Sequence, residues 1–194
     1  MTPSFSLCVF CGSRFGEPVF IETARTVGRW IGEHGGQLVY GGGNNGLMGV
    51  MAEATLTAGG RVVGVIPHAL VEKEWAKLDC TELHVVDTMH DRKRLMGERA
   101  DAFLALPGGI GTLEEFFEVW TWRQLGYHDK PIGLLDADGY YADLLAFLRT
   151  SVSRGFMSAS LMDLVRVHTD AGELLAELAA AARASVLPSV LTQI

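Results

Sequence analysis

Short apolar runs alternate with longer amphipathic segments along the 194-residue chain, and this alternation constrains the fold most. Runs such as SLCVFCG, QLVYGGG and RVVGVIP are apolar at nearly every position instead of every second one. Continuous apolar strands are typical of a parallel sheet covered by helices on both faces. The sequence therefore predicts a doubly wound α/β fold with a mainly parallel sheet. We expect one domain over residues 1–194, with residues 185–194 as a tail that is either loose or packed on a neighbour.

Helical periodicity and glycine or proline punctuation divide the chain into thirteen expected elements. Strands are expected over residues 6–12, 37–43, 61–67, 81–87, 101–109, 130–139 and 164–169. Helices are expected over residues 17–36, 47–60, 89–100, 112–126, 140–152 and 171–184.

Charge and cysteine usage exclude several classes of protein. A net charge of −7 argues against a nucleic-acid binder with a broad basic surface. The three cysteines include Cys8 and Cys11, whose spacing places them on opposite faces of a strand, so we expect buried thiols in a reducing cytoplasm. No apolar run is long enough to span a membrane, and no histidine spacing indicates a metal site. We expect neither a metal nor a cofactor.

Glycine clusters follow three of the expected strands, at Gly12, Gly41–Gly43 and Gly108–Gly111. In a doubly wound fold, ligands bind beyond the carboxyl ends of the strands. The three loops are therefore expected to meet at one crevice.

The loop GGGNNG, residues 41–46, satisfies the dinucleotide pattern G-x-G-x-x-G. It follows the second strand instead of the first, and the next strand ends in Val65-Ile66-Pro67 without an acid to hold a ribose. These features disfavour NAD. Two interpretations stay open: the backbone N–H groups of Gly42 and Gly43 contact a phosphate or sugar, or the glycines only form a tight turn.

The loop PGGIGT, residues 107–112, leads from the fifth strand into a helix that we expect to begin at Thr112. A helix N-terminus offers unpaired N–H groups and a positive dipole end, which together bind phosphate. The loop lacks the lysine of a triphosphate-binding P-loop, so a monophosphate suits it better.

Glu115 allows two interpretations. Thr112 and Glu115 have the spacing of a capping box, in which Glu115 would only stabilise its own helix. Alternatively, Glu115 faces the crevice as an ionised carboxylate that stabilises a cationic transition state or orients water. A first-turn position would favour the ionised form.

Arg92, Lys93 and Arg94 lie in the opening turns of an expected helix, where cations oppose the helix dipole. Their position at the carboxyl edge of the sheet suggests anion binding by Arg92 and Lys93. For Arg94 we prefer a solvated surface.

With DTMHDRK and ALPGGIGTLEEFFEVWTWRQLG in view, the chain resembles the LOG family of cytokinin riboside 5′-monophosphate phosphoribohydrolases, often mislabelled as lysine decarboxylases. The resemblance implies a Rossmann-like homodimer. It also implies hydrolysis of the N-glycosidic bond of an AMP-like nucleotide, giving an adenine-type base and ribose 5-phosphate. Arg92 and Glu115 match the catalytic pair. The positions matching substrate contacts are Glu74, Lys93, Gly109, Ile110, Gly111, Thr112, Leu113, Glu114 and Thr121.

Three alternatives to this function differ in chemistry. A broad nucleotide 5′-monophosphate nucleosidase in salvage would share the reaction and differ in its base pocket. A carrier of a nucleotide or of molybdenum cofactor would not require Arg92 and Glu115. A decarboxylase would require a lysine-bound pyridoxal phosphate, and no lysine has a recognisable setting for one.

Overall fold

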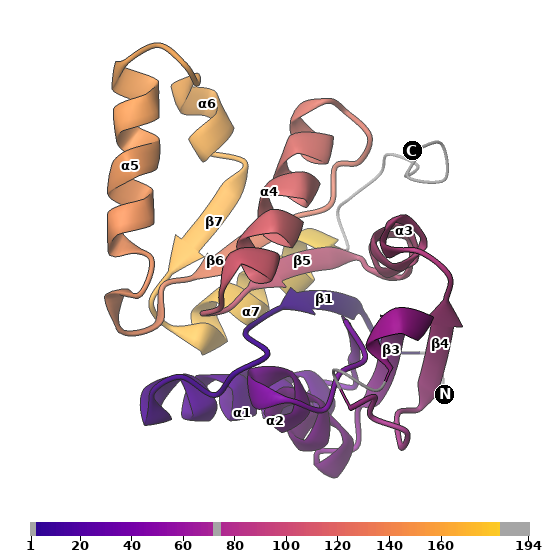
Figure 1. Cartoon of the computed structure of the whole chain (residues 1–194). Helices are drawn as coiled ribbons and strands as arrows, with labels where there is room; N and C mark the ends of the chain where they lie inside the picture. Colours follow the sequence, from indigo (N-terminus) through magenta and orange to yellow (C-terminus); the bar gives the residue numbers. More distant parts are fainter. Residues whose placement is uncertain (1–2, 72–74, 183–194) are drawn as a thin grey trace.

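A computed structural model describes residues 3–71 and 75–182 and contains one seven-stranded sheet (Figure 1). The strand order is β4-β3-β2-β1-β5-β6-β7, and every neighbouring pair is parallel. The strands are β1 (Ser6–Phe10), β2 (Gln37–Tyr40), β3 (Arg61–Pro67), β4 (Glu82–Val86), β5 (Ala102–Ala105), β6 (Ile132–Leu135) and β7 (Val165–His168). The predicted doubly wound α/β fold is confirmed.

Helices cover both faces of the sheet (Figure 1). On one face pack α1 (Pro18–Glu33), α2 (Gly46–Thr57) and α7 (Ala171–Ala182). On the other pack α3 (Met89–Arg99), α4 (Ile110–Gln124) and α5 (Ala142–Ser153). Three short elements were not predicted: the 3-10 turns η1 (His68–Leu70) and η2 (Ala137–Gly139), and α6 (Ala159–Met162).

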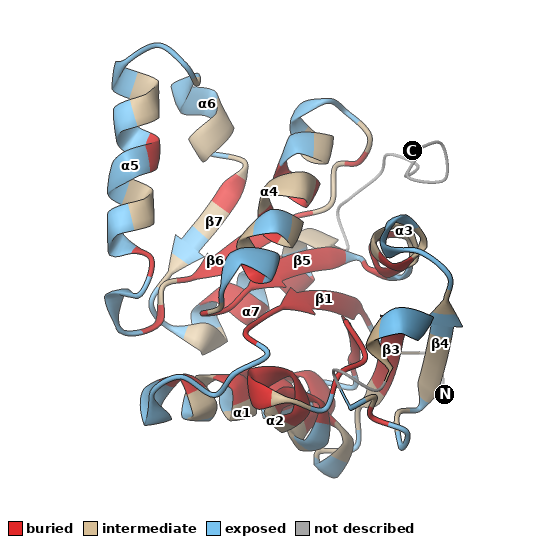
Figure 2. Ribbon diagram, viewed as in Figure 1, coloured by how far each residue is buried: buried red, intermediate tan, exposed pale blue. Residues whose placement is uncertain are grey.

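The strands separate two apolar cores, because alternate side chains point to opposite faces. Leu7, Val9 and Cys11 belong to the core under α1, α2 and α7, whereas Cys8 and Phe10 belong to the core under α3, α4 and α5. Figure 2 shows the buried central strands between helices whose outer sides are exposed, while the edge strands β4 and β7 are only partly buried. The prediction that Cys8 and Cys11 are buried thiols on opposite faces is confirmed.

The α1 and α2 helices approach each other closely at Gly28 and Gly32. A Cβ atom on Gly28 would lie 2.3 Å from the main-chain oxygen of Met51. Glycine at this position, in the second half of α1, lets the backbones of the two helices pack directly against each other.

The direction of winding reverses between β1 and β5. From β1 the chain moves outward through β2, β3 and β4, and it then crosses back to place β5 on the other side of β1. The loops after β1 and β5 therefore lead to helices on opposite faces and leave a crevice at the carboxyl ends of the strands. The main chain closes the base of this crevice, where Gly12 donates a hydrogen bond to the oxygen of Pro107.

No helix in the described ranges has the length and apolarity that crossing a membrane requires. The expected tail, residues 185–194, lies outside the described residues.

Candidate active site

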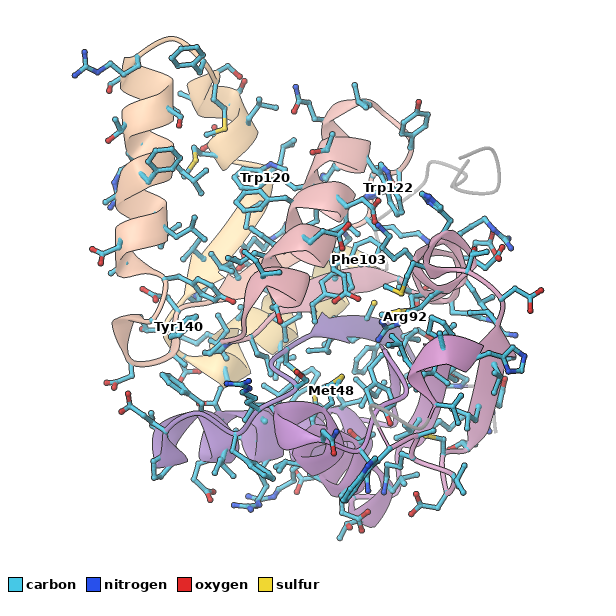
Figure 3. All side chains as sticks on the ribbon, in the orientation of Figure 1. Met48, Arg92, Phe103, Trp120, Trp122 and Tyr140 are labelled. Atoms are coloured by element: carbon cyan, nitrogen blue, oxygen red, sulfur yellow. The ribbon has the colours of Figure 1, made fainter. Side chains whose placement is uncertain are left out.

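A cavity of about 300 Å³ lies at the carboxyl ends of the central strands. Loops after β1, β3 and β5 line it, together with the first turns of α2, α3 and α4 (Figure 1). Its lining residues are Cys11, Ser13, Met48, Leu70, Met89, Arg92, Gly109, Ile110, Gly111, Thr112, Glu114 and Glu115. Arg92 and Met48, which reach it from α3 and α2, are labelled in Figure 3. Two of the three glycine loops, those after β1 and β5, therefore share one site with the two predicted catalytic residues, whereas the loop at Gly41–Gly43 does not line it.

The N-terminus of α4 forms one wall of the cavity. Gly109 is the N-cap residue, and the first main-chain bond of the helix joins the Leu113 nitrogen to the Gly109 oxygen at 3.1 Å. The N–H groups of Ile110, Gly111 and Thr112 lie in the first turn and have no acceptor inside the helix. These groups and the helix dipole favour an anion at this wall.

The capping box, one of the two interpretations left open for Glu115, is not formed with Thr112 as the N-cap residue. The helix begins two residues earlier than expected, at Ile110, so Thr112 is buried inside its first turn and Glu115 lies in the second turn. The side-chain cap at this edge of the sheet belongs instead to α3, where the Thr88 hydroxyl oxygen accepts a hydrogen bond from the Asp91 nitrogen at 3.1 Å. Glu115 is therefore not placed to cap α4, and the capping interpretation no longer explains this residue.

Arg92 is a buried cation, with 6% of its surface exposed. Its Nη2 atom donates to the main-chain oxygen of Gly41 at 3.0 Å, and its Nε atom donates to that of Val65 at 3.2 Å. Both acceptors lie at the carboxyl ends of strands, Gly41 directly after β2 and Val65 within β3. A buried guanidinium needs such acceptors, because its charge is costly to remove from water.

Glu115 lies half-buried beside the end of β1. Burial, with a further contribution from the Glu115 charge, raises the pKa of the Cys11 thiol. Burial and then the same charge raise the pKa of the Cys8 thiol, which Lys130 and Arg92 partly oppose. The Glu115 carboxylate therefore lies near both cysteines, of which Cys11 lines the cavity, and the two thiols stay protonated and inert.

Lys93 lies on α3 and forms ion pairs with two carboxylates of α4. Its Nζ atom lies 2.7 Å from Glu114 and 2.8 Å from Glu118. Burial by itself would lower the pKa of Lys93, but the hydrogen bonds to these two carboxylates outweigh it and raise the pKa. Arg94, for which a solvated surface was preferred, pairs with Asp91 and Glu98 of its own helix.

Two consecutive tyrosines hold the loop between β5 and α4. The hydroxyl of Tyr141 donates to the main-chain oxygen of Leu106 at 2.6 Å, and that of Tyr140 donates to the oxygen of Gly108 at 2.7 Å. Tyr140, labelled in Figure 3, also lines a neighbouring cavity of about 360 Å³ that shares Ser13 and Gly109 with the first.

Six residues expected to contact substrate do not line the 300 Å³ cavity or cannot be placed in it. Lys93 is one of them, because its ammonium group pairs with Glu114 and Glu118. Glu74 lies outside the described residues. Gly42 and Gly43 are buried and do not line the cavity, and Leu113 packs against the core under α3 and α4. The Thr121 hydroxyl donates to the Phe117 oxygen at 2.7 Å. Because Thr121 follows Thr112 by nine residues, it lies about 14 Å further along α4.

Sequence reasoning missed five lining residues: Cys11, Ser13, Met48, Leu70 and Met89. Cys11 and Ser13 flank Gly12, which was recognised as a loop glycine, so their neighbourhood was a usable signal. Met48, Leu70 and Met89 are apolar residues whose position depends on tertiary packing. In the described part of the chain, no group of three or more histidine, cysteine or carboxylate side chains is placed to hold a metal ion.

Comparison with known proteins places this site in a wider context. Residues 48–178 match a family model described as "possible lysine decarboxylase". A protein of Oryza sativa subsp. japonica, named as a probable cytokinin riboside 5′-monophosphate phosphoribohydrolase, is 46% identical over 181 residues, covering 93% of this chain and 79% of that relative. A cytokinin riboside 5′-monophosphate phosphoribohydrolase of Arabidopsis thaliana is 44% identical over 173 residues, covering 89% of this chain and 81% of the relative.

Solved structures share the fold at lower identity. The molybdenum cofactor binding protein of Rippkaea orientalis is 21% identical, with a TM-score of 0.69 over 93% of this chain and 97% of that chain. The molybdenum cofactor carrier protein of Chlamydomonas reinhardtii is also 21% identical, with a TM-score of 0.67 over 95% of this chain and 99% of that chain. These similarities support the architecture and carry no information about the ligand.

Proposed function

Because the chain belongs to the LOG family of cytokinin riboside 5′-monophosphate phosphoribohydrolases, we propose that it hydrolyses the N-glycosidic bond of an N6-substituted adenosine 5′-monophosphate. The products are an N6-substituted adenine and ribose 5-phosphate. One observation carries the proposal: Arg92 and Glu115 line the same cavity as the N-terminus of α4.

In this proposal the 5′-phosphate binds at the start of α4. The N–H groups of Ile110, Gly111 and Thr112 donate to the phosphate, and the positive end of the helix dipole favours its negative charge. Ser13 adds a hydroxyl from the loop after β1. A phosphate fixed there holds the ribose in the cavity at a constant distance from Glu115. Binding energy from this remote group can then align and distort the sugar.

Glu115 stabilises the reacting carbon. Breaking the bond sends its electron pair to the purine and leaves positive charge on C1′ and the ring oxygen, as in other glycosidic cleavages. A carboxylate beside these atoms stabilises that charge and orients a water molecule. The water oxygen bonds to C1′, one of its protons is lost, and the base takes up a proton. A half-buried position strengthens this electrostatic effect relative to water.

Arg92 supplies a fixed positive charge to the same cavity. Its two bonds to main-chain oxygens leave the guanidinium little freedom to move. It binds phosphate or sugar oxygens, and its charge helps to keep Glu115 ionised.

A panel of nucleotides with free base as the readout tests the proposal. We expect base release from N6-prenyl AMP, slower release from AMP and little from pyrimidine 5′-monophosphates. Equal rates across all bases would instead indicate a salvage nucleosidase. Tight nucleotide binding without base release would indicate a carrier.

We propose that the protein works as a homodimer in which a second copy brings Thr121 to the site. Thr121 lies about 14 Å along α4 from the phosphate wall and does not line the cavity, so a second copy is proposed to bring this side chain to the nucleotide. Exposed apolar residues support such an interface, including Leu125 at the end of α4 with 61% exposure and Phe147 on α5 with 66%. Mixing Glu115→Gln with Thr121→Arg chains tests this, because only a shared site would restore activity in the mixed dimer.

We also propose a cytoplasmic location, because all three cysteines are free thiols, which suits a reducing compartment. Fractionation of cells that express the tagged chain checks this directly.

A further inference from the structure

The Arg92 side chain occupies the space beside Gly41, the first glycine of the loop after β2. A Cβ atom built on Gly41 would lie 2.0 Å from Arg92 Nη2, 3.1 Å from Cζ and 3.5 Å from Nε, and these are its three nearest atoms. The guanidinium therefore occupies the space where any other residue at position 41 would place its side chain. The two residues are 51 positions apart in the sequence.

The main chain of the same loop holds this guanidinium. Gly41 provides both the open space and one acceptor, at 3.0 Å from Nη2. The second acceptor, Val65, lies on the neighbouring strand β3 at 3.2 Å from Nε. Two main-chain acceptors on adjacent strands fix the plane of the guanidinium more firmly than flexible side chains would.

The loop at residues 41–43 is held by contacts with the segment at residues 75–79. Gly42 adopts a φ of +77°, which favours glycine, and its oxygen accepts a hydrogen bond from the Lys77 nitrogen at 2.9 Å. The Asn44 nitrogen donates to the Trp75 oxygen at 2.9 Å. Lys77 is anchored in turn, because its buried Nζ atom pairs with Glu53 and Asp79. The position of Gly41 is thus set by contacts between residues that do not line the cavity.

We propose that Gly41 is a positioning residue for Arg92, so that the GGG sequence at residues 41–43 serves as a socket for the catalytic arginine and not as a cradle for the nucleotide. This inference rests on the catalytic role proposed for Arg92. It gives a function to the loop that resembles a dinucleotide motif, whose second and third glycines are buried and do not line the cavity.

Gly41→Ala tests the socket. The added methyl group meets the far end of a flexible side chain, so the arginine moves while the backbone keeps its path. We expect turnover to fall by at least about tenfold, towards the loss of about a hundredfold expected for Arg92→Ala. We expect the melting temperature to fall only by the cost of the two lost main-chain hydrogen bonds of Arg92.

Gly28→Ala is the matched control. Its methyl group would lie 2.3 Å from a main-chain oxygen between α1 and α2, where nothing flexible can yield. It should lower the melting temperature and leave kcat nearly unchanged. Opposite effects of two glycine-to-alanine changes would separate positioning from general stability.

A double-mutant cycle provides the readout that a structural role would not change. If Gly41 acts through Arg92, adding Gly41→Ala to Arg92→Ala should lower kcat by less than about twofold. Full additivity of the two losses would overturn the socket. If Gly41→Ala alone fails to fold, folding of the double variant supports the clash with the guanidinium, and failure of both variants overturns the proposal.

The same measurements separate this inference from the proposed function. Normal activity in Arg92→Ala would contradict the catalytic role of the arginine. An inactive Arg92→Ala with a fully active Gly41→Ala would contradict only the socket.

Discussion

The ammonium group of Lys93 on α3 lies 2.8 Å from the carboxylate of Glu118 on α4, and 2.7 Å from that of Glu114. The lysine side chain is largely buried, with 13% of it exposed. It therefore links the helix that carries Arg92 to the helix that carries Glu115. This position differs from the direct nucleotide contact that the family resemblance implies for Lys93.

Removal of either side of this link should have the same kinetic result. We expect Lys93→Met, and Glu114→Gln combined with Glu118→Gln, each to lower kcat by about tenfold, because small displacements of catalytic groups are costly. KM should change little in both, as measured by steady-state release of base. A rise in KM confined to Lys93→Met would show that the lysine binds the nucleotide itself.

Glu115→Gln should lower turnover by at least about a hundredfold while the melting temperature stays within a few degrees of the parent. The side chain lies in the second turn of α4, where it cannot cap the helix, so the loss is one of charge at the reacting centre. Glu114→Gln, one residue away and more exposed, is the control and should lose less than about tenfold. Near-normal turnover in Glu115→Gln, with earlier melting, would contradict this role.

Tyr141→Phe should loosen the loop between β5 and α4, where the 5′-phosphate is proposed to bind. The change removes a donor 2.6 Å from the Leu106 oxygen at a site where the tyrosine is 2% exposed, and a buried acceptor without a partner costs about 1–3 kcal/mol. We expect earlier unfolding in urea and a higher KM for the nucleotide. Tyr140→Phe removes the comparable bond to Gly108 at a residue that is 45% exposed, so water can replace it and the effect should be smaller. Equal losses from the two variants would argue against this burial effect.

His128 should make stability depend on pH. Burial is the main cause that lowers the pKa of His128 to about 4, compared with 6.5 for an unperturbed histidine. Its Nδ1 atom accepts a hydrogen bond from the Lys130 nitrogen at 3.1 Å, and its Nε2 atom lies 3.0 Å from the Val119 oxygen, to which it donates. The neutral ring satisfies both bonds, whereas protonation would place a proton against the Lys130 N–H group.

Between pH 6.5 and about 4 the unfolded chain binds a proton on this histidine and the folded chain does not. This contribution to stability is therefore fully present above pH 6.5 and is lost as the pH falls. From urea unfolding at pH 7 and pH 5, the wild type should lose about 1–2 kcal/mol more than His128→Gln. Equal losses in the two proteins would show that His128 does not titrate in this way.

Much of the fold could be predicted because local pattern and global structure agree. Continuous apolar strands such as QLVY required cover on both faces, and the alternation with helices then required a parallel, doubly wound sheet. The start of α4 was misplaced because Ile110 and Gly111 follow a glycine pair and resemble loop, although they form the first turn. The short α6 carried too few residues for a helical period to be detected.

The parts of the site whose residues are close in sequence were predictable. The parts that depend on residues distant in sequence were not. Residues 109–112 and Glu115 sit on one short motif, so a single pattern located most of the cavity wall. The contact between Gly41 and Arg92 joins positions 51 residues apart, and no local pattern can show that a glycine is open to admit a distant side chain. For the same reason the role of Lys93 between two helices appeared only in three dimensions.

The central claim is that the start of α4 binds the 5′-phosphate and so delivers the sugar to Glu115. Its most direct test is the ratio of kcat/KM for N6-prenyl AMP to that for N6-prenyl adenosine, measured by release of the same free base. We expect a ratio of at least about a hundred, because the phosphate would supply binding energy that aligns the reacting carbon. A ratio near one would contradict phosphate anchoring at this helix.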